Sequence, residues 1–184
     1  MKLSIQLFSL ILLLMLFAWL VRYETLKQFP KKEIIQMKQE EFKTNQLSRF
    51  IRYRVSTMPI EYSMVIAQNI IAVANEYNTS VDLIVGIVET ESCWNASAIS
   101  SAGARGLMQI LRGETVTVDP EQAHNIHYNL SIGCEILRGK IKLAGGDLNL
   151  ALSNYSGGAN EYTNKVLVCM GRWILFQQSQ EVIK

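Results

Sequence analysis

The sequence predicts a mainly helical protein of 184 residues, in which one compact domain follows an apolar helix and a linker. Three observations predict this class. Apolar residues recur at three- and four-residue intervals in the middle of the chain, as they do along one face of an α-helix. An uncharged run lies near the N-terminus, and glycine and aspartate stand where helices would end and begin. The expected domains are residues 1–23, 24–58 and 59–184.

The first element is an uncharged run of 19 residues, 3–21, between Lys2 and Arg22. As a helix it would be about 28 Å long, close to the hydrocarbon thickness of a bilayer. A cleaved signal peptide is the competing interpretation, but the run is long for one and lacks a small-x-small cleavage pattern. We therefore expect residues 1–23 to form an uncleaved transmembrane anchor.

Residues 24–58 form the second element and are rich in Lys, Arg, Glu and Gln, with only loosely periodic apolar residues. This composition predicts a partly helical linker or stalk. The alternative is a basic amphipathic surface helix over residues 47–55, with Arg49, Arg52 and Arg54 on its polar side.

The compact domain is expected to begin at Pro59, and about 120 residues are enough for one hydrophobic core. Its first helix is expected at residues 60–77. A later helix follows the stop at Gly145-Gly146, is capped by Asp147 and carries Tyr155 to its end. The apolar face of the first helix consists of Ile66, Ile70, Ile71 and Ala74.

Glu91 stands at the end of the domain's second expected helix. It falls next on an apolar stripe with helical spacing, which consists of Val81, Ile84, Ile87 and Val88. Partial desolvation and the negative end of the helix dipole both favour the protonated carboxyl group. A carboxylic acid that keeps its proton near neutral pH is what the cleavage of a glycosidic bond requires. An ordinary glutamate at a frayed helix end is the alternative.

Glu89 is the competing carboxylate on the same helix. Two residues correspond to about 200° of rotation, so Glu89 and Glu91 cannot share a face. Glu89 lies on the side of Asp82 and is expected to be a solvated surface residue.

Residues of fixed type follow Glu91 at fixed offsets. They are Glu91-Ser92, Ser100, Gly103-Ala104 and Gly106-Leu107-Met108-Gln109, followed by Asn129-Leu130, Gly133, Leu137 and Gly145-Gly146-Asp147 through Tyr155. In these motifs the sequence resembles the catalytic domain of the soluble-type (SLT) lytic transglycosylases, which have a lysozyme-like fold and act on peptidoglycan. The resemblance covers roughly residues 59–170.

The resemblance implies a lysozyme-like (α+β) domain with a small β element. It also implies that Glu91 is the only catalytic carboxylate, and that Ser100, Met108, Gln109 and Tyr155 line the groove for the sugar chain. The sequence ties no second carboxylate to Glu91 by a local pattern, although most glycosidases use two. The N-acetyl group of the substrate would then supply the nucleophile, and the product would be a 1,6-anhydro sugar. No cofactor or metal is implied.

Two other functions stay open. A more distant relation to goose-type lysozymes would make the protein a hydrolase of the same bond, and a wall-binding or assembly protein could keep the fold without activity. The expected partners are peptidoglycan glycan strands and the membrane, with secretion, conjugation or phage-entry machinery as a candidate. A net charge of +2 is too small to indicate nucleic-acid binding.

The expected location is a single membrane span with the catalytic domain facing the peptidoglycan, in a bacterial inner membrane or a virion membrane. The positive-inside rule favours the opposite orientation, because most nearby basic residues follow the span. These residues are Arg22, Lys27, Lys31 and Lys32. The transglycosylase motif takes precedence in this interpretation, and the conflict remains.

Three cysteines leave at least one thiol unpaired, and a disulfide between Cys93 and Cys134 stays open because sequence gives no β-carbon geometry. His124 and His127 are spaced i, i+3 without a third ligand nearby, so surface histidines are favoured over a zinc site.

Overall fold

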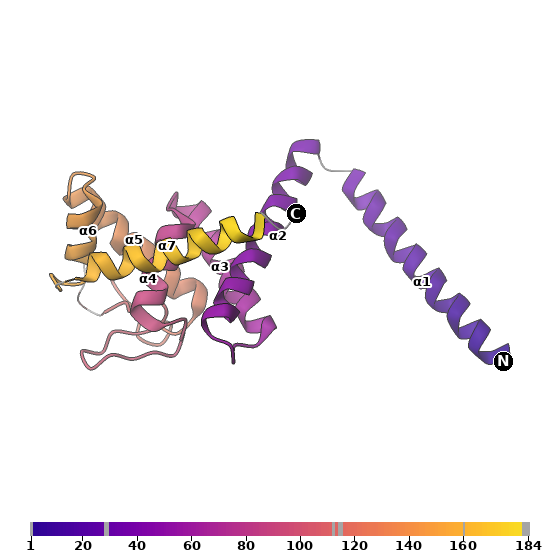
Figure 1. Ribbon diagram of the computed structural model, residues 1–184, viewed down its shortest axis with the longest axis horizontal. Coiled ribbons are helices and arrows are strands. Elements are labelled where there is room, and N and C mark those ends of the chain that lie inside the picture. The colour runs from indigo at the N-terminus through magenta and orange to yellow at the C-terminus, as the bar shows by residue number, and fades with distance from the viewer. Residues whose placement is uncertain (1, 28–29, 112, 114–115, 160, 182–184) are drawn as a thin grey trace. The chain divides into compact units, whose positions relative to one another are not determined.

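The computed structural model describes residues 2–27, 30–111, 113, 116–159 and 161–181, of which 2–9 and 24–27 are described by their backbone alone (Figure 1). The described residues form helices α1 (Lys2–Lys27), α2 (Lys31–Arg54), α3 (Ile60–Tyr77), α4 (Val81–Ser92), α5 (Ile126–Leu143), α6 (Leu148–Tyr155) and α7 (Tyr162–Glu181). The chain divides into two units, Met1–Phe42 and Lys43–Lys184.

The first unit contains α1 and the beginning of α2. Large apolar side chains of α1 from Leu10 to Val21 are exposed. Within the described part of the chain, no helix combines the length and the apolar character needed to cross a membrane. The transmembrane anchor predicted at residues 1–23 is thus not found in the part of the chain that the structure describes. Residues 3–9 of the predicted span lie outside the residues whose side chains are described.

The second half of α2 belongs to the second unit, ahead of the boundary that the sequence suggested at Pro59. Leu47, Phe50 and Ile51 have no exposed surface and lie in the main hydrophobic core. Their spacing places them on one face of the helix, but charged neighbours obscure so short a stripe in the sequence. The ring of Phe50 lies 6.1 Å from that of Trp94 and 5.2 Å from that of Trp173, between ring centroids.

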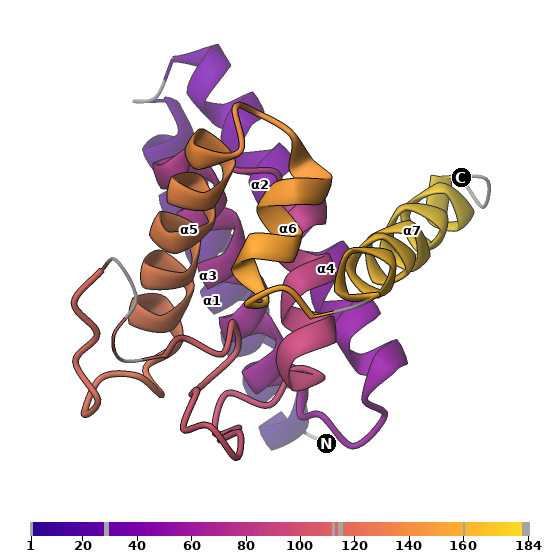
Figure 2. The ribbon, with the colours of Figure 1, turned by 90° about the vertical axis from the view of Figure 1, so that its left-hand side faces the viewer.

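Helix α4 is the most deeply buried helix of the second unit, because every residue from Leu83 to Glu89 is buried. It packs chiefly against α7, while α5 packs against both α3 and α6 (Figure 2). Gly86 allows this close approach: a β-carbon there would lie 2.8 Å from the carbonyl oxygen of Val166 on α7. A helix enclosed in this way has no solvated face near Glu89, which one-sided amphipathic periodicity does not reveal.

The predicted helix at residues 60–77 is confirmed as α3, and Asp147 caps α6 as expected by accepting a hydrogen bond from the backbone N–H of Leu150 at 3.1 Å. The small β element consists, among the described residues, of two isolated antiparallel bridges. They join Arg105 to Ile99 and to Ile110. The observed architecture is therefore almost entirely helical.

The three cysteines are free thiols in the structure, so the disulfide between Cys93 and Cys134 is not formed. Cys93 is exposed, whereas Cys134 and Cys169 are buried. Burial raises the pKa of the Cys134 thiol to about 12, which keeps it protonated and makes it an ordinary core residue.

If α2 is part of the core, replacing Phe50 with Ala should lower the free energy of unfolding by about 3–5 kcal/mol, because it leaves a cavity among aromatic rings. Tyr53→Ala on the same helix is the control, since Tyr53 is 71% exposed and should cost about 1 kcal/mol or less. Urea denaturation measures both. Equal losses for the two variants would contradict a core role for α2.

Candidate active site

The carboxyl group of Glu91 projects from the last turn of α4 and meets α7. Its Oε1 accepts a hydrogen bond of 2.6 Å from the hydroxyl of Tyr162, the first residue of α7. Burial raises the pKa of Glu91 above its usual 4.5, and the hydrogen bond from Tyr162 opposes this with a smaller effect. Tyr162 itself stays protonated, because burial and the neighbouring carboxylate both raise its pKa. Glu91 therefore holds its proton to higher pH than an exposed glutamate.

Glu91 opens into a cavity of about 370 Å³. Of the described residues that line it, Glu91 alone carries a carboxylate. The rest of the wall combines hydroxyl and amide groups with aliphatic and aromatic side chains, which suits a neutral polyhydroxylated ligand. The lining residues are Glu91, Ser100, Ala104, Gln109, Ile110, Leu111, Ile136, Tyr155, Ser156, Gly157, Ala159 and Tyr162.

The loop after α4 supplies one side of this cavity. The Oγ of Ser100 accepts a hydrogen bond of 3.0 Å from the backbone N–H of Ala104. Gly106 has φ of +77°, and a β-carbon there would collide with the side chain of Asn129. Gln109 also has a positive φ, of +48°, and its Nε2 donates to the carbonyl oxygens of Gly106 and Ala98 at 3.0 and 3.3 Å. Gly106 and Gln109 thus determine the conformation of this loop.

Asn129 on α5 binds the backbone of the same loop and is fully buried. Its Nδ2 donates to the carbonyl oxygens of Arg105 and Ala123 at 2.8 and 2.7 Å, and its Oδ1 accepts from the backbone N–H of Met108 at 2.8 Å. One side chain therefore satisfies three backbone groups of two connecting segments. This explains why the motif has asparagine at the start of this helix.

Three of the four predicted substrate-binding residues, Ser100, Gln109 and Tyr155, line the cavity together with Glu91. Met108 is placed differently: its side chain is fully buried and packs against Gly133 of α5. It therefore belongs to the core. Its carbonyl oxygen accepts a hydrogen bond of 2.9 Å from the hydroxyl of Tyr155, so Met108 acts on the site only through its backbone.

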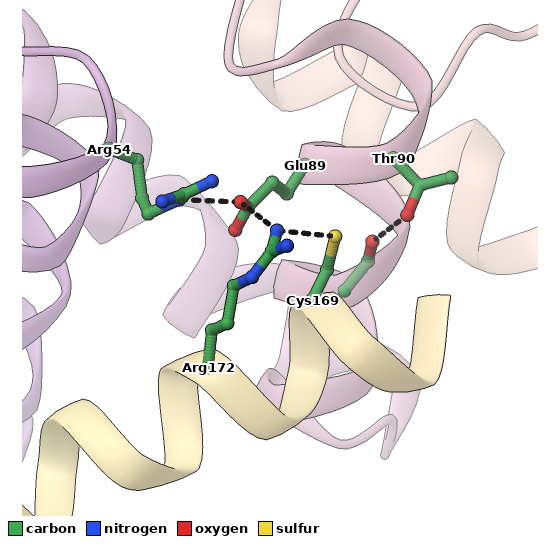
Figure 3. Close-up of polar contacts among 6 residues, drawn as sticks. Arg54, Glu89, Thr90, Cys169 and Arg172 are labelled. Carbon is green, nitrogen blue, oxygen red and sulfur yellow. Dashed lines mark hydrogen bonds and ion pairs between the residues drawn. The ribbon is translucent and has the colours of Figure 1, made fainter. Parts of the chain in front are cut away.

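Two residues near the site were not predicted correctly from the sequence. Tyr162 is missing from the predicted set, and its only sequence signal is an aromatic residue at the start of the last helix. Its ring stacks on that of Tyr155, with centroids 6.4 Å apart. Glu89, expected to be solvated, is only 5% exposed and forms an ion pair with Arg54 at 2.6 Å (Figure 3). That prediction was wrong because α7 and α2 cover the face of α4 opposite Glu91.

His124 supports the loop. Its Nδ1 lies 3.0 Å from the carbonyl oxygen of Ala96, and its Nε2 lies 3.3 Å from Nη1 of Arg105. Across the described ranges, no group of three or more His, Cys, Asp or Glu residues could hold a metal ion.

This site lies within the stretch of the chain that matches a known family. Residues 68–167, more than half of the chain, match the model of the Transglycosylase SLT domain. The chain belongs to the transglycosylase SLT domain family. The predicted family is thereby confirmed.

A curated relative of this SLT domain is also a transglycosylase. This domain is 34% identical over 90 residues to the transglycosylase of Enterobacteria phage PRD1. The matched stretch makes up 49% of this chain and 34% of the phage protein. The chain thus spans about a third of the phage relative's length.

Two solved structures are also similar. The lytic transglycosylase Slt of Pseudomonas aeruginosa, an inactive mutant, superposes with a TM-score of 0.53 at 16% identity, over 73% of this chain and 30% of that one. The 70 kDa soluble lytic transglycosylase of Escherichia coli matches with a TM-score of 0.45 at 18% identity, over 75% and 28% of the two chains. The first likeness shows that the matched part of this chain has the fold of that lytic transglycosylase, as the SLT resemblance implied.

The raised pKa of Glu91 has a consequence for stability. A carboxyl group whose pKa is higher in the folded state costs stability once the pH rises above its unfolded value, because the folded site disfavours the charge. Glu91→Gln removes this cost while keeping an acceptor for Tyr162. The variant should therefore gain in unfolding free energy relative to wild type as the pH rises from below 4.5 to 8. Urea denaturation across this range tests it. An unfolding free energy of Glu91→Gln that falls relative to that of the wild type as the pH rises would contradict the raised pKa.

Asn129→Ala should destabilise the domain by about 3 kcal/mol or more, because it leaves three buried backbone groups without a partner. Asn154→Ala on the exposed side of α6 is the control and should change the stability by about 0.5 kcal/mol or less. Thermal unfolding compares the two variants. A small loss at Asn129 would show that the loop finds other partners.

Proposed function

We propose that the protein is a peptidoglycan lytic transglycosylase that cleaves the β-1,4 bond between N-acetylmuramic acid and N-acetylglucosamine, with Glu91 as its single acid and base. The observation that carries the proposal is the position of Glu91: it is the one carboxylate among the described cavity-lining residues, and burial favours its protonated form. Such an acid suits the first proton transfer in glycoside cleavage.

In the first step the protonated carboxyl group of Glu91 gives its proton to the glycosidic oxygen, and the bond from that oxygen to C1 of the muramic acid breaks. The carbonyl oxygen of the sugar's own N-acetyl group attacks C1 and forms a cyclic intermediate. In the second step the Glu91 carboxylate takes the proton of the C6 hydroxyl, whose oxygen attacks C1 and releases the N-acetyl group. Glu91 is again protonated, and the product is a 1,6-anhydro sugar.

Tyr162 fits both steps. Its hydroxyl donates to Oε1 of Glu91, so Oε2 is the oxygen that would carry the transferable proton. After the proton has left, the same hydrogen bond stabilises the carboxylate, since a donor to the charged form favours that form. Ser100, Gln109 and Tyr155 would contact the glycan in the adjoining cavity.

A hydrolase of the same bond is the second candidate, because the N-acetyl intermediate could be attacked by water in the same cavity. A protein that binds the wall without cleaving it is the third. The two enzymes differ in one bond of the product: an anhydro ring for the transglycosylase and a reducing end for the hydrolase.

The membrane anchor at residues 3–21, the single-pass location and the machinery partners stay predictions. The uncharged run and the exposed apolar side chains of α1 support an association with a membrane. The relative named Transglycosylase comes from a phage, which is consistent with a phage enzyme among the predicted settings. Fractionation of cells that express the chain, with and without residues 2–27, tests the anchor: loss of the chain from washed membranes on truncation is the expected result.

Purified sacculi incubated with the wild-type chain should release muropeptides with 1,6-anhydromuramoyl ends, identified by mass spectrometry. Glu91→Gln should lower the rate by about 10²-fold to 10⁴-fold, because no other positioned acid replaces it. The control, Glu61→Gln, changes an exposed glutamate of α3 and should keep the wild-type rate. Reducing ends would favour the hydrolase, and wild-type activity in Glu91→Gln would refute the proposed role of Glu91.

A further inference from the structure

A second carboxylate, that of Glu89 (Figure 3), stands two residues before Glu91 on α4. Two residues correspond to about 200° of rotation, so the two side chains lie on opposite faces of the helix. Oε1 of Glu89 accepts a hydrogen bond of 2.6 Å from Nε of Arg54, at the end of α2. The same oxygen lies 3.5 Å from Nη1 of Arg172 on α7. Glu89 is only 5% exposed, whereas the side chains of Arg54 and Arg172 are 32% and 49% exposed. Two arginines from two helices therefore converge on one buried carboxylate.

A buried carboxylate such as that of Glu89 destabilises the fold unless it stays paired with a cation. Oε2 of Glu89 is buried and has no hydrogen-bond partner among the described residues. Removing one partner of a buried ion pair leaves an uncompensated charge, which is far more destabilising than the intact pair is stabilising. Arg54 and Arg172 thus fix the position of the Glu89 carboxylate.

The backbone of the same turn leads directly to the catalytic residue. The carbonyl oxygen of Glu89 accepts the hydrogen bond of 3.2 Å from the N–H of Cys93, where α4 ends in a left-handed residue. Glu91 lies between these two positions. Helix α7 also contacts both faces of the turn: Tyr162 donates to Glu91, and Arg172 pairs with Glu89.

Arg54 lies outside residues 68–167, the part that matches the SLT family model. Its helix nevertheless belongs to the same compact unit as Glu91, through the buried side chains of Leu47, Phe50 and Ile51. The contact with Glu89 therefore extends the site beyond the recognised domain to a segment that the sequence presented as a linker.

We propose that Glu89 and Arg54 are positioning residues for catalysis: their ion pair, assisted by Arg172, fixes the last turn of α4 so that the Glu91 carboxyl group points at the cavity. This inference rests on the proposed function of Glu91. A shift of about 1 Å in an acid that must meet the glycosidic oxygen costs up to about 100-fold in rate. The ion pair therefore affects the chemical step more than the affinity for the glycan.

The formal charge of this cluster changes between the variants that test the proposal. Glu89, Arg54 and Arg172 together carry a net charge of +1. Arg54→Met lowers this charge to zero and should raise the pKa of Glu91, whereas Glu89→Gln raises it to +2 and should lower that pKa. The double variant restores +1.

The other groups that face Glu91 do not change between these variants. The described cavity-lining residues include Tyr155 and Tyr162 as titratable groups, and the buried residues of α3 are uncharged. Differences in the pKa of Glu91 between the variants therefore reflect the charge of the cluster formed by Glu89, Arg54 and Arg172.

The test measures kcat and KM of the full chain on soluble glycan strands, from pH 4 to 9, for wild type, Arg54→Met, Glu89→Gln and the double variant. Arg49→Met and Arg52→Met are the controls, since they remove arginines of the same helix that make no contact with Glu89. Arg54→Met should lower kcat by about 10-fold to 100-fold and change KM by about threefold or less. The controls should match wild type.

The pH profile and the double variant separate positioning from stability. The alkaline limb of kcat should move to higher pH in Arg54→Met and to lower pH in Glu89→Gln, and return to the wild-type position in the double variant. The double variant should recover unfolding free energy, because no buried charge is left alone, yet keep a low kcat. A double variant that recovers both would show a role in stability alone and would overturn the proposal.

Failure of this inference is distinguishable from failure of the proposed function. If the wild-type chain releases no product, the proposed function fails. Crystal structures of Arg54→Met and of the wild-type chain then still decide whether the ion pair positions Glu91. A Glu91 carboxyl group displaced from the Tyr162 hydroxyl in Arg54→Met supports the proposal, and an unmoved carboxyl group overturns it.

Discussion

The environment of the Glu91 carboxyl group is the constraint on which the rest of the site depends. Burial at the end of α4 disfavours its charge, and the hydrogen bond from Tyr162 favours that charge, with burial the larger effect. The balance serves an acid that must give up its proton and then take one back. A fully buried acid would hold its proton too firmly, whereas an exposed one would lose it below neutral pH.

The architecture explains how this balance is kept. Helix α4 is enclosed along most of its length, and Gly86 lets α7 approach so closely that Tyr162 reaches Glu91. On the other side of the cavity, Asn129 ties the glycine-rich loop to α5. The acid and the loop that faces it are therefore fixed by different helices of one core.

Much of the site could be predicted from the sequence, because its signals are local. The stripe that ends in Glu91, the cap at Asp147 and the offsets of Ser100 and Gln109 lie within single helices or loops. Met108 was misplaced because a motif records which residue types recur, and an apolar member serves the core as readily as the cleft.

The other misjudged residues depend on contacts between distant segments. Tyr162 approaches Glu91, and Arg54 approaches Glu89, only after α7 and α2 have packed against α4. The second half of α2 was expected to be a linker because its buried residues are few and stand among charges. A single sequence carries no pattern that links such pairs, so helix periodicity assigned Glu89 to a solvated face that does not exist.

The most direct measurement of the account is the pKa of Glu91 in the wild-type chain, followed by ¹³C NMR of its side-chain carboxyl carbon as the pH is varied. The account predicts a midpoint clearly above the usual 4.5. A midpoint at or below that value would mean that the site stabilises the carboxylate, and Glu91 could then not be the acid that starts the reaction.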